Sequence, residues 1–185
     1  MRSNNVIGYI TEGFPGVMTF LEREISGLIQ HGWEVSVFAL HKESAVHYAA
    51  ELDQSLVNTH YCLNRNILSF KMLQSHIRIL FNRPKVYFQS ILFLLRTYGT
   101  SWYSLSRAIY AFMKAGYFYA NAKSRGVQHL HAHFSGRTVD VAIFLSQFLN
   151  VGFSFTGHSN DVTGNYPLLQ NKINLASFVV AENER

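Results

Sequence analysis

The chain has 185 residues, of which 48% are hydrophobic and only 15% are charged, so it is long enough and apolar enough to bury one core. Its formal charge of +5 favours an anionic partner or surface. Cys62 is the only cysteine, which excludes an internal disulfide and fits a reducing cytoplasm. We see no secretory signal, and the most apolar run, residues 86–95, is far shorter than the roughly 20 residues that span a bilayer.

The basic charge is concentrated in the middle of the chain. No acidic residue occurs between Asp53 and Asp140. The same span holds eleven of the sixteen basic residues: Arg65, Lys71, Arg78, Arg83, Lys85, Arg96, Arg107, Lys114, Lys123, Arg125 and Arg137. This segment predicts contact with an anionic membrane surface or with an acceptor phosphate.

The first forty residues predict a strand, a helix and a second strand. Residues 5–11 (NVIGYIT) are a short apolar run typical of a buried strand, and residues 12–16 have turn composition. Apolar residues at helical spacing predict a helix over Thr19–Gln30, which Gly32 ends. Residues 34–40 predict the second strand, and such a unit is typical of a parallel sheet.

The glycine-containing turn before this helix has two interpretations. It can bring backbone N–H groups against a phosphate of a ligand. Gly13 and Gly16 can also serve only to permit a tight turn.

The middle of the chain predicts mainly helices. Residues 44–53 favour a helix, residues 59–63 a short third strand, and residues 67–125 two or three helices. Within residues 102–121 one stripe, taken as the core face, contains Trp102, Leu105, Ile109, Phe112 and Gly116. A second stripe interleaves tyrosines with cations: Tyr103, Arg107, Tyr110, Lys114 and Tyr117. This second stripe predicts a face against a membrane interface or an anionic lipid, the alternative being an ordinary solvated helix face.

Residues 128–161 predict strand, turn, helix, strand and turn, and each strand ends in histidines and small polar residues. The first cluster contains His131, His133, Ser135 and Gly136, and the second contains Thr156, Gly157, His158, Asn160 and Asp161. Ligands of open parallel sheets bind beyond the carboxyl ends of the strands, so both clusters are expected at one functional edge. Residues 167–176 and 177–181 predict a further helix and strand.

Histidine side chains at this edge can act on a hydroxyl group. A neutral imidazole donates or accepts a proton, and Asp161 can orient a substrate or a histidine. We expect His131 to point to the opposite side of the strand from His133. His131, His133 and His158 could alternatively bind zinc. Because no cysteine supports them and the H-x-H rings are expected to diverge, we predict no metal.

Several stretches resemble a known family. HAHFSGRTVDVAIFLS, FSFTGHSNDV, LLQNKINLASFVVAENE and the opening GFPGVMTFLEREISGLIQHGWEVSVFAL are similar to the amino-terminal half of a family-four retaining glycosyltransferase of the GT-B fold. The resemblance implies a single α/β domain over residues 1–185, with a Rossmann-like parallel sheet flanked by helices and a basic helical middle segment. In that family a carboxyl-terminal donor domain follows, and its Glu-rich signature has no counterpart in this sequence.

The resemblance also implies roles for individual residues. His133 would reach toward the transferred sugar, and His158 and Asp161 would line the cleft as catalytic groups. Substrate contacts would come from Gly13, Phe14, Gly16, Thr19, Ser135, Gly136, Arg137, Thr156, Gly157 and Asn160. The donor would be a nucleotide-sugar, the acceptor a glycan or a lipid-linked glycan for cell-surface polysaccharide, and the place of action the inner face of the membrane.

One alternative belongs to another class of protein. The acid-free, aromatic-rich segment also fits a non-catalytic module that docks on anionic membrane lipid or on a partner glycosyltransferase subunit. We find no nucleic-acid-binding motif in the sequence, so we expect no nucleic-acid partner. In either case, we expect the exposed cleft face to bind a donor-domain chain or a second copy of this chain.

Overall fold

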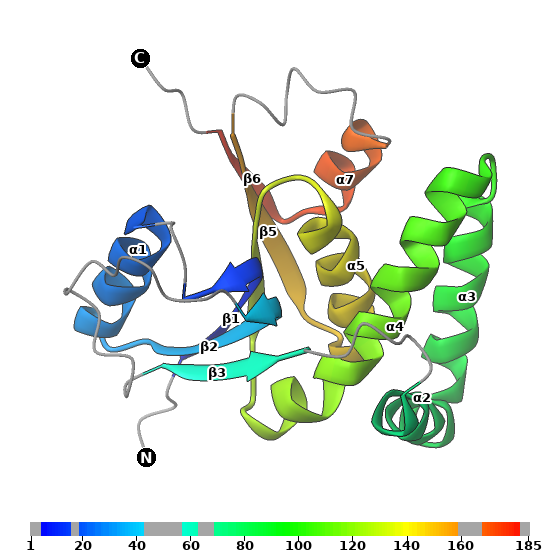
Figure 1. The fold of residues 1–185 in the computed structure, drawn as a ribbon, viewed down its shortest axis with the longest axis horizontal. Helices are drawn as coiled ribbons and strands as arrows, with labels where there is room; N and C mark the ends of the chain where they lie inside the picture. The colour runs from blue at the N-terminus through cyan, green and yellow to red at the C-terminus, as the bar shows by residue number, and fades with distance from the viewer. Residues whose placement is uncertain (1–4, 16–18, 43–56, 63–68, 159–167, 182–185) are drawn as a thin grey trace.

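The computed structural model describes residues 5–15, 19–42, 57–62, 69–158 and 168–181. These residues form an α/β, Rossmann-like domain with one six-stranded parallel sheet and six flanking helices (Figure 1). The elements are β1 (Val6–Phe14), α1 (Thr19–Gln30), β2 (Glu34–Lys42), β3 (Asn58–Tyr61), α2 (Phe70–Asn82), α3 (Pro84–Tyr98), α4 (Trp102–Ser124), β4 (His129–His133), α5 (Arg137–Leu149), β5 (Gly152–Gly157), α7 (Leu169–Leu175) and β6 (Phe178–Ala181). The predicted fold class is therefore confirmed.

The strand order places the first strand in the middle of the sheet. The order is β3-β2-β1-β4-β5-β6, so the direction of winding changes between β1 and β4. At such a switch point the connections leave toward opposite faces of the sheet, and the carboxyl ends of the two strands border a crevice that can hold a ligand. His133 lies at the end of β4 and therefore at this point.

The sheet separates two hydrophobic clusters. The larger cluster packs residues such as Ile10, Leu130 and Phe155 of the sheet against α2, α3, α4 and α5. The smaller one packs Tyr9 and Val37 against α1. In Figure 1, α1 covers one face of the sheet, and the other described helices lie on the opposite face.

The first strand is longer than predicted. Gly13 and Phe14, predicted to lie in a turn, continue β1 and pair with His41 and Lys42 of β2. Phe14 is buried in the smaller cluster. The extended pairing and this burial hold the segment in the sheet despite its turn-like composition, since glycine weakens a strand without preventing one.

The predicted middle segment contains three helices in its described part, and α2 and α3 meet at a proline. Pro84 is the first residue of α3, where its missing N–H and fixed φ are tolerated. The helix predicted over residues 44–53 lies outside the described residues. None of the described helices has both the length and the apolar character needed to cross a bilayer.

The buried face of α4 agrees with the predicted one only in part. Phe112 and Gly116 are buried as predicted, and Leu105 packs against the core. Trp102 and Ile109 are exposed, whereas the buried positions are mostly small: Ser104, Ala108, Ala111, Phe112, Lys114, Ala115, Gly116, Phe118, Tyr119 and Ala122. Small residues allow α4 to approach its neighbours α2 and α5 closely. Of the predicted stripe, Trp102 and Ile109 therefore do not belong to the core face.

Candidate functional site

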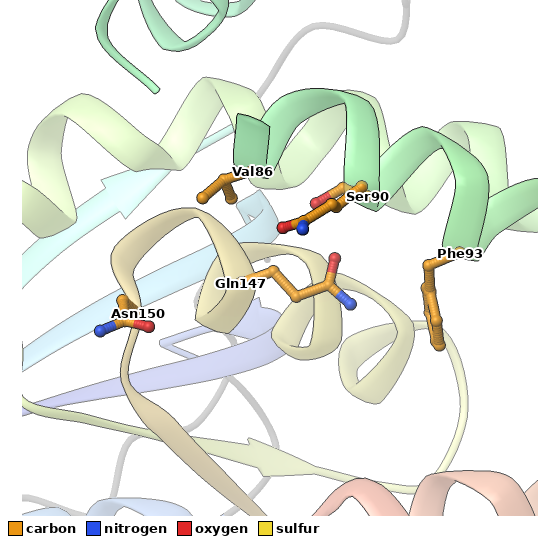
Figure 2. Close-up of a pocket in the computed structure, with 6 residues that line it drawn as sticks. Val86, Ser90, Phe93, Gln147 and Asn150 are labelled. Atoms are coloured by element: carbon orange, nitrogen blue, oxygen red, sulfur yellow. The ribbon is translucent and has the colours of Figure 1, made fainter. Parts of the chain in front are cut away.

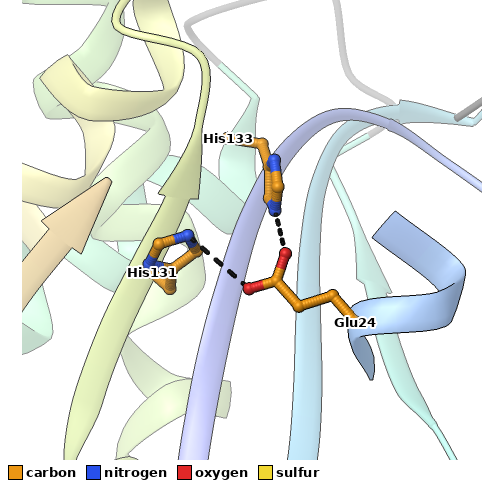
Figure 3. Close-up of side chains that lie close together, drawn as sticks. All are labelled: Glu24, His131 and His133. Carbon is orange, nitrogen blue, oxygen red and sulfur yellow. Dashed lines mark hydrogen bonds and ion pairs between the residues drawn. The ribbon is translucent and has the colours of Figure 1, made fainter. Parts of the chain in front are cut away.

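The two histidines of β4 point to the same side of the sheet, which corrects the expectation that they diverge. His131 and His133 are two residues apart, and side chains at that spacing share one face of a strand. Their rings lie 5.3 Å apart, centroid to centroid, and both approach Glu24 of α1 (Figure 3). The H-x-H sequence therefore builds a compact cluster on the face that α1 covers.

Glu24 is the centre of a hydrogen-bonded group at the switch point. Its Oε2 accepts a hydrogen bond from His133 Nε2 at 3.0 Å, and its Oε1 accepts one from the Tyr9 hydroxyl at 2.6 Å. Glu24 Oε1 also lies 4.0 Å from His131 Nε2. One carboxylate thus joins α1, β1 and β4, and it holds the imidazole of His133 in a fixed orientation.

The surroundings keep Glu24 ionised. Burial by itself would raise the pKa of this carboxyl, but the hydrogen bonds from His133 and Tyr9, and then the two nearby histidines, lower it to about 2. The pKa of the Tyr9 hydroxyl is raised by burial and by the adjacent Glu24 charge. Tyr9 therefore remains a proton donor to the carboxylate.

His131 is held in its neutral form. Burial lowers its pKa to about 4, the neighbouring His133 and His129 add to the decrease, and Glu24 opposes it. Each ring nitrogen of His131 already shares a hydrogen bond: Nδ1 with Ser154 at 2.8 Å and Nε2 with Thr156 at 3.0 Å. Of the predicted substrate residues, Thr156 is thus engaged with His131.

Aromatic rings bring the second predicted cluster beside His133. The His158 ring lies 6.2 Å from that of His133, and it packs on Phe134 at 4.5 Å and on Phe20 at 5.3 Å. Phe20 also contacts His133 at 5.6 Å. The carboxyl ends of β4 and β5 therefore meet, as predicted, and Gly157 closes β5 immediately before His158.

One nitrogen of His133 carries no described contact. His133 is only 1% exposed, and its Nδ1 is buried with no hydrogen-bond partner among the described residues. Since buried polar atoms are usually paired, an orphan nitrogen at a switch point is an observation that favours a ligand.

The predicted substrate residues of the β4–α5 turn are held by other parts of the chain. Ser135 is buried, and the backbone carbonyls of Ser135 and Gly136 accept hydrogen bonds from Lys172 Nζ at 2.8 and 3.1 Å. Arg137 is exposed and makes a two-pronged ion pair with Glu12 of β1 at 3.2 and 3.0 Å. This pair joins β1 to the first residue of α5 at the switch point.

A group of buried, paired side chains around Asp140 stabilises the start of α5, which follows this turn. Asp140 in the first turn of α5 accepts from Lys172 at 2.8 Å, from Tyr98 at 3.1 Å and from Arg107 at 3.2 Å. It thereby links α5 to α7, α3 and α4. Because a buried charge is costly unless it is paired, the group holds the first turn of α5 against these three helices.

Part of the predicted site lies outside the described residues. This applies to Gly16, Asn160 and Asp161. Thr19 is the first residue of α1. Gly13 and Phe14 belong to β1, and the buried Phe14 side chain is committed to the core.

The predicted membrane face on α4 is not a continuous exposed surface. Lys114 is 2% exposed, and its Nζ donates to the Cys62 carbonyl at 3.3 Å. Arg107 is largely covered and pairs with Asp140. Of this stripe Tyr103 is exposed, while Tyr110 and Tyr117 are half-buried. Helical spacing could not show that Cys62, just after β3, and Asp140 of α5 would supply partners for Lys114 and Arg107.

The cluster also has donor atoms of the kind that bind metals. One carboxylate oxygen of Glu24 and one ring nitrogen each of His131 and His133 lie within 4.8 Å of one another. The expectation of divergent rings, used against zinc, was therefore wrong. Two further hydroxyls already occupy the nitrogens of His131, so a metal would have to displace Thr156 or Ser154.

Sequence reasoning missed Glu24, Tyr9, Asp140 and Lys172 as parts of this edge. Glu24 had a signal: it lies four residues from both Phe20 and Leu28, so a carboxylate interrupts an apolar stripe of α1. Tyr9 and Lys172 had none, since their partners are distant in the sequence.

A separate hollow lies on the opposite face of the sheet. It has a volume of about 340 Å³ between α3 and α5 and is lined by Val86, Gln89, Ser90, Phe93, Gln147 and Asn150 (Figure 2). None of these residues belongs to the predicted site. The sheet itself separates this hollow from His133.

No protein-family model matches the chain, and no curated protein matches it either. The fold and the geometry of the switch point are therefore the observations from which function is argued.

Proposed function

We propose that this chain is the acceptor-binding half of a retaining glycosyltransferase, which moves a sugar from a nucleotide-sugar to a glycan or lipid-linked acceptor in cell-surface polysaccharide synthesis. The observation that carries the proposal is the buried His133, held by Glu24 at the switch point of a Rossmann-like sheet. The family resemblance of the HAHF and TGHSND stretches supports it as well.

The chemistry of the cluster fits recognition of hydroxyl groups. His133 donates through Nε2 to Glu24, and its Nδ1 has no hydrogen-bond partner among the described residues. A sugar or acceptor hydroxyl can engage Nδ1 in either protonation state, because a hydroxyl both donates and accepts. The rings of Phe20 and His158 lie beside the His133 ring. In the proposed enzyme Glu24 is a positioning residue, because it orients His133 and stays ionised near neutral pH.

We propose that the cluster works as a hydrogen-bonded array without a metal. Tyr9 already donates to Glu24, and Ser154 and Thr156 engage both nitrogens of His131. A metal would replace these bonds, whereas a sugar hydroxyl at His133 Nδ1 would leave them in place.

Acceptor binding tests the proposal on the chain itself. A panel of oligosaccharides is titrated into the 185-residue protein, and the ring-proton resonances of its histidines are followed by NMR. We expect a binding acceptor to shift the His133 and His158 resonances and to leave that of His31 unchanged, because His31 is exposed at the far end of α1.

The matched variants are His133→Ala and His31→Ala. The first should weaken acceptor binding on the order of tenfold or more, as expected for the loss of a hydrogen bond at a buried polar site, and the second should have no effect. If no glycan perturbs the edge, or if His133→Ala binds as tightly as the unaltered chain, the proposed acceptor site is wrong.

A non-catalytic module that docks on anionic lipid remains the second candidate function. It is favoured by a separate observation on α2 and α3.

A further inference from the structure

Helix α2 exposes a stripe of large apolar side chains. Phe70, Leu73, Ile77 and Phe81 are separated by three, four and four residues, so they lie on one side of the helix. Phe70 is 79% exposed and Phe81 is 80% exposed. The interior of the protein receives a different side of α2, which contains Met72, His76 and Ile79. Helix α2 therefore has a second apolar side, which does not contact the core of the protein.

Helix α3 repeats this arrangement. Phe88, Leu92 and Leu95 are separated by four and three residues and are all exposed, whereas Ser90, Leu94 and Tyr98 are buried. Two consecutive helices thus each present a stripe of exposed apolar side chains, over about three turns of α2 and about two turns of α3. In Figure 1 they lie at the outer side of the helical layer, away from the sheet.

Cations accompany both apolar stripes. Lys71 and Arg78 are exposed on α2, and Lys85 and Arg96 are exposed on α3. By helical spacing each pair lies on the same flank of its stripe, about 50–115° around the helix from the stripe's centre. The sequence has no acidic residue between Asp53 and Asp140 that could neutralise them locally.

We propose that these two helices form a docking surface for an anionic lipid bilayer, with the apolar stripes inserted at the interface and the four cations against the headgroups. We call Phe70, Leu73, Ile77, Phe81, Phe88, Leu92 and Leu95, with Lys71, Arg78, Lys85 and Arg96, the lipid surface. The inference goes beyond the proposed sugar transfer and does not depend on it. It replaces the α4 stripe as the place of membrane contact.

Charge complementarity selects the bilayer as the occupant. Helices that lie in a membrane interface combine an apolar face with Lys and Arg at its border, and they bind more strongly to anionic lipid. Each basic residue near an anionic surface adds about 1 kcal/mol of attraction, which corresponds to about a fivefold gain in binding. The lipid surface has this composition on both helices.

Vesicle sedimentation tests the inference. The chain is mixed with vesicles of phosphatidylcholine, either pure or with about one third phosphatidylglycerol. We expect binding to the anionic vesicles, weaker binding at high salt because exposed charges are screened, and little binding to the neutral ones. The variant with Phe70→Ser and Phe81→Ser should bind at least about tenfold more weakly, because two large apolar side chains no longer leave water.

A charge-reversed variant, Lys71→Glu with Arg78→Glu, should also lose on the order of tenfold or more in binding to anionic vesicles. The controls are Phe178→Ser, which removes an exposed aromatic ring from β6, and Lys123→Glu, which reverses an exposed charge at the end of α4. Both should bind like the unaltered chain, and circular dichroism verifies that every variant keeps its helices.

Three outcomes would overturn the inference. The first is no binding to anionic vesicles, and the second is equal loss of binding in the control variants. The third is a dimer in solution that Phe70→Ser and Phe81→Ser dissociate while vesicle binding is absent, since the stripes would then form a contact between two copies. The glycan titration is carried out without lipid, so failure of one proposal leaves the other measurable.

Discussion

At the scale of single residues, Glu24 determines the character of the site. It is half-exposed, yet it receives hydrogen bonds from Tyr9 and His133 and lies near His131. Each donor stabilises the carboxylate form, so the charge remains although burial opposes it. Glu24 orients His133, while Ser154 and Thr156 orient the neighbouring His131.

His131 should make stability depend on pH. Its pKa falls from an ordinary value of 6.5 to about 4, so the unfolded chain takes up a proton that the folded chain rejects. We therefore expect the free energy of unfolding to decrease as the pH is lowered from 7 toward 4, by up to about 3 kcal/mol from this group. Urea unfolding followed by circular dichroism at pH 7, 5.5 and 4.5 measures the effect.

The window above pH 4.5 separates His131 from Glu24. Glu24 has a lowered pKa of about 2 against an ordinary 4.5, so its contribution is lost only below pH 4.5. Other groups near His131 are His129 and His133, and burial also lowers the pKa of His76 and His129. The variant His131→Asn should therefore show a shallower pH dependence, though not a flat one. An identical slope in the variant and the unaltered chain would contradict this prediction.

At the scale of elements, Gly116 of α4 and His76 of α2 allow these two helices to pack closely. His76 of α2 is buried over Gly116, its Nε2 lies 3.2 Å from the Met113 carbonyl, and its Nδ1 lies 3.2 Å from the Tyr87 hydroxyl. A Cβ atom at position 116 would overlap the His76 ring. The absence of a side chain here thus lets the two helices meet.

Gly116→Ala should destabilise the protein by about 1–3 kcal/mol, because overpacking displaces His76 and its two hydrogen bonds. Gly27→Ala is the matched control, since a Cβ on that residue of α1 meets no atom within 4 Å. The control should be neutral or slightly stabilising, as alanine favours a helix more than glycine does. Equal unfolding midpoints in urea for both variants would show that the contact between His76 and Gly116 does not hold α2 against α4.

At the scale of the whole molecule, the candidate site lies at the edge of one sheet. The switch point is bordered by strands β1 and β4 of this sheet. On the edge strand β6, Phe178 and Val180 are exposed and lie on the same face of the sheet as His131 and Ser154. Sugar transfer requires the donor and acceptor to be held together and shielded from water. A second body must therefore complete the site if the proposed function is right.

Residues 1–185 alone should not transfer sugar at a measurable rate. The test supplies a panel of nucleotide-sugars with an acceptor found in the glycan titration and follows product by mass spectrometry. The same chain, joined to or mixed with a donor-binding domain, should then form product. Steady turnover by the isolated chain, together with tight binding of a nucleotide-sugar, would contradict the half-enzyme interpretation.

The sequence by itself determined the class of fold and the meeting of two histidine-containing strand ends at one edge of the sheet. Apolar runs and helical spacing predicted the alternation of strands and helices, including the bounds of α1, because these patterns depend on neighbours within one or two turns. His133 and His158 were predicted to share one edge for the same reason: each follows a strand, and parallel strands end at one side of a sheet.

Only the tertiary structure decided which distant residues meet. Glu24 and His133 are 109 residues apart, and no local pattern encodes their contact. The same holds for the buried Lys114 and for the exposed stripes of α2 and α3. Whether a helix face is buried depends on which other elements pack against it, so the periodicity of one helix shows that a face is apolar but not what covers it.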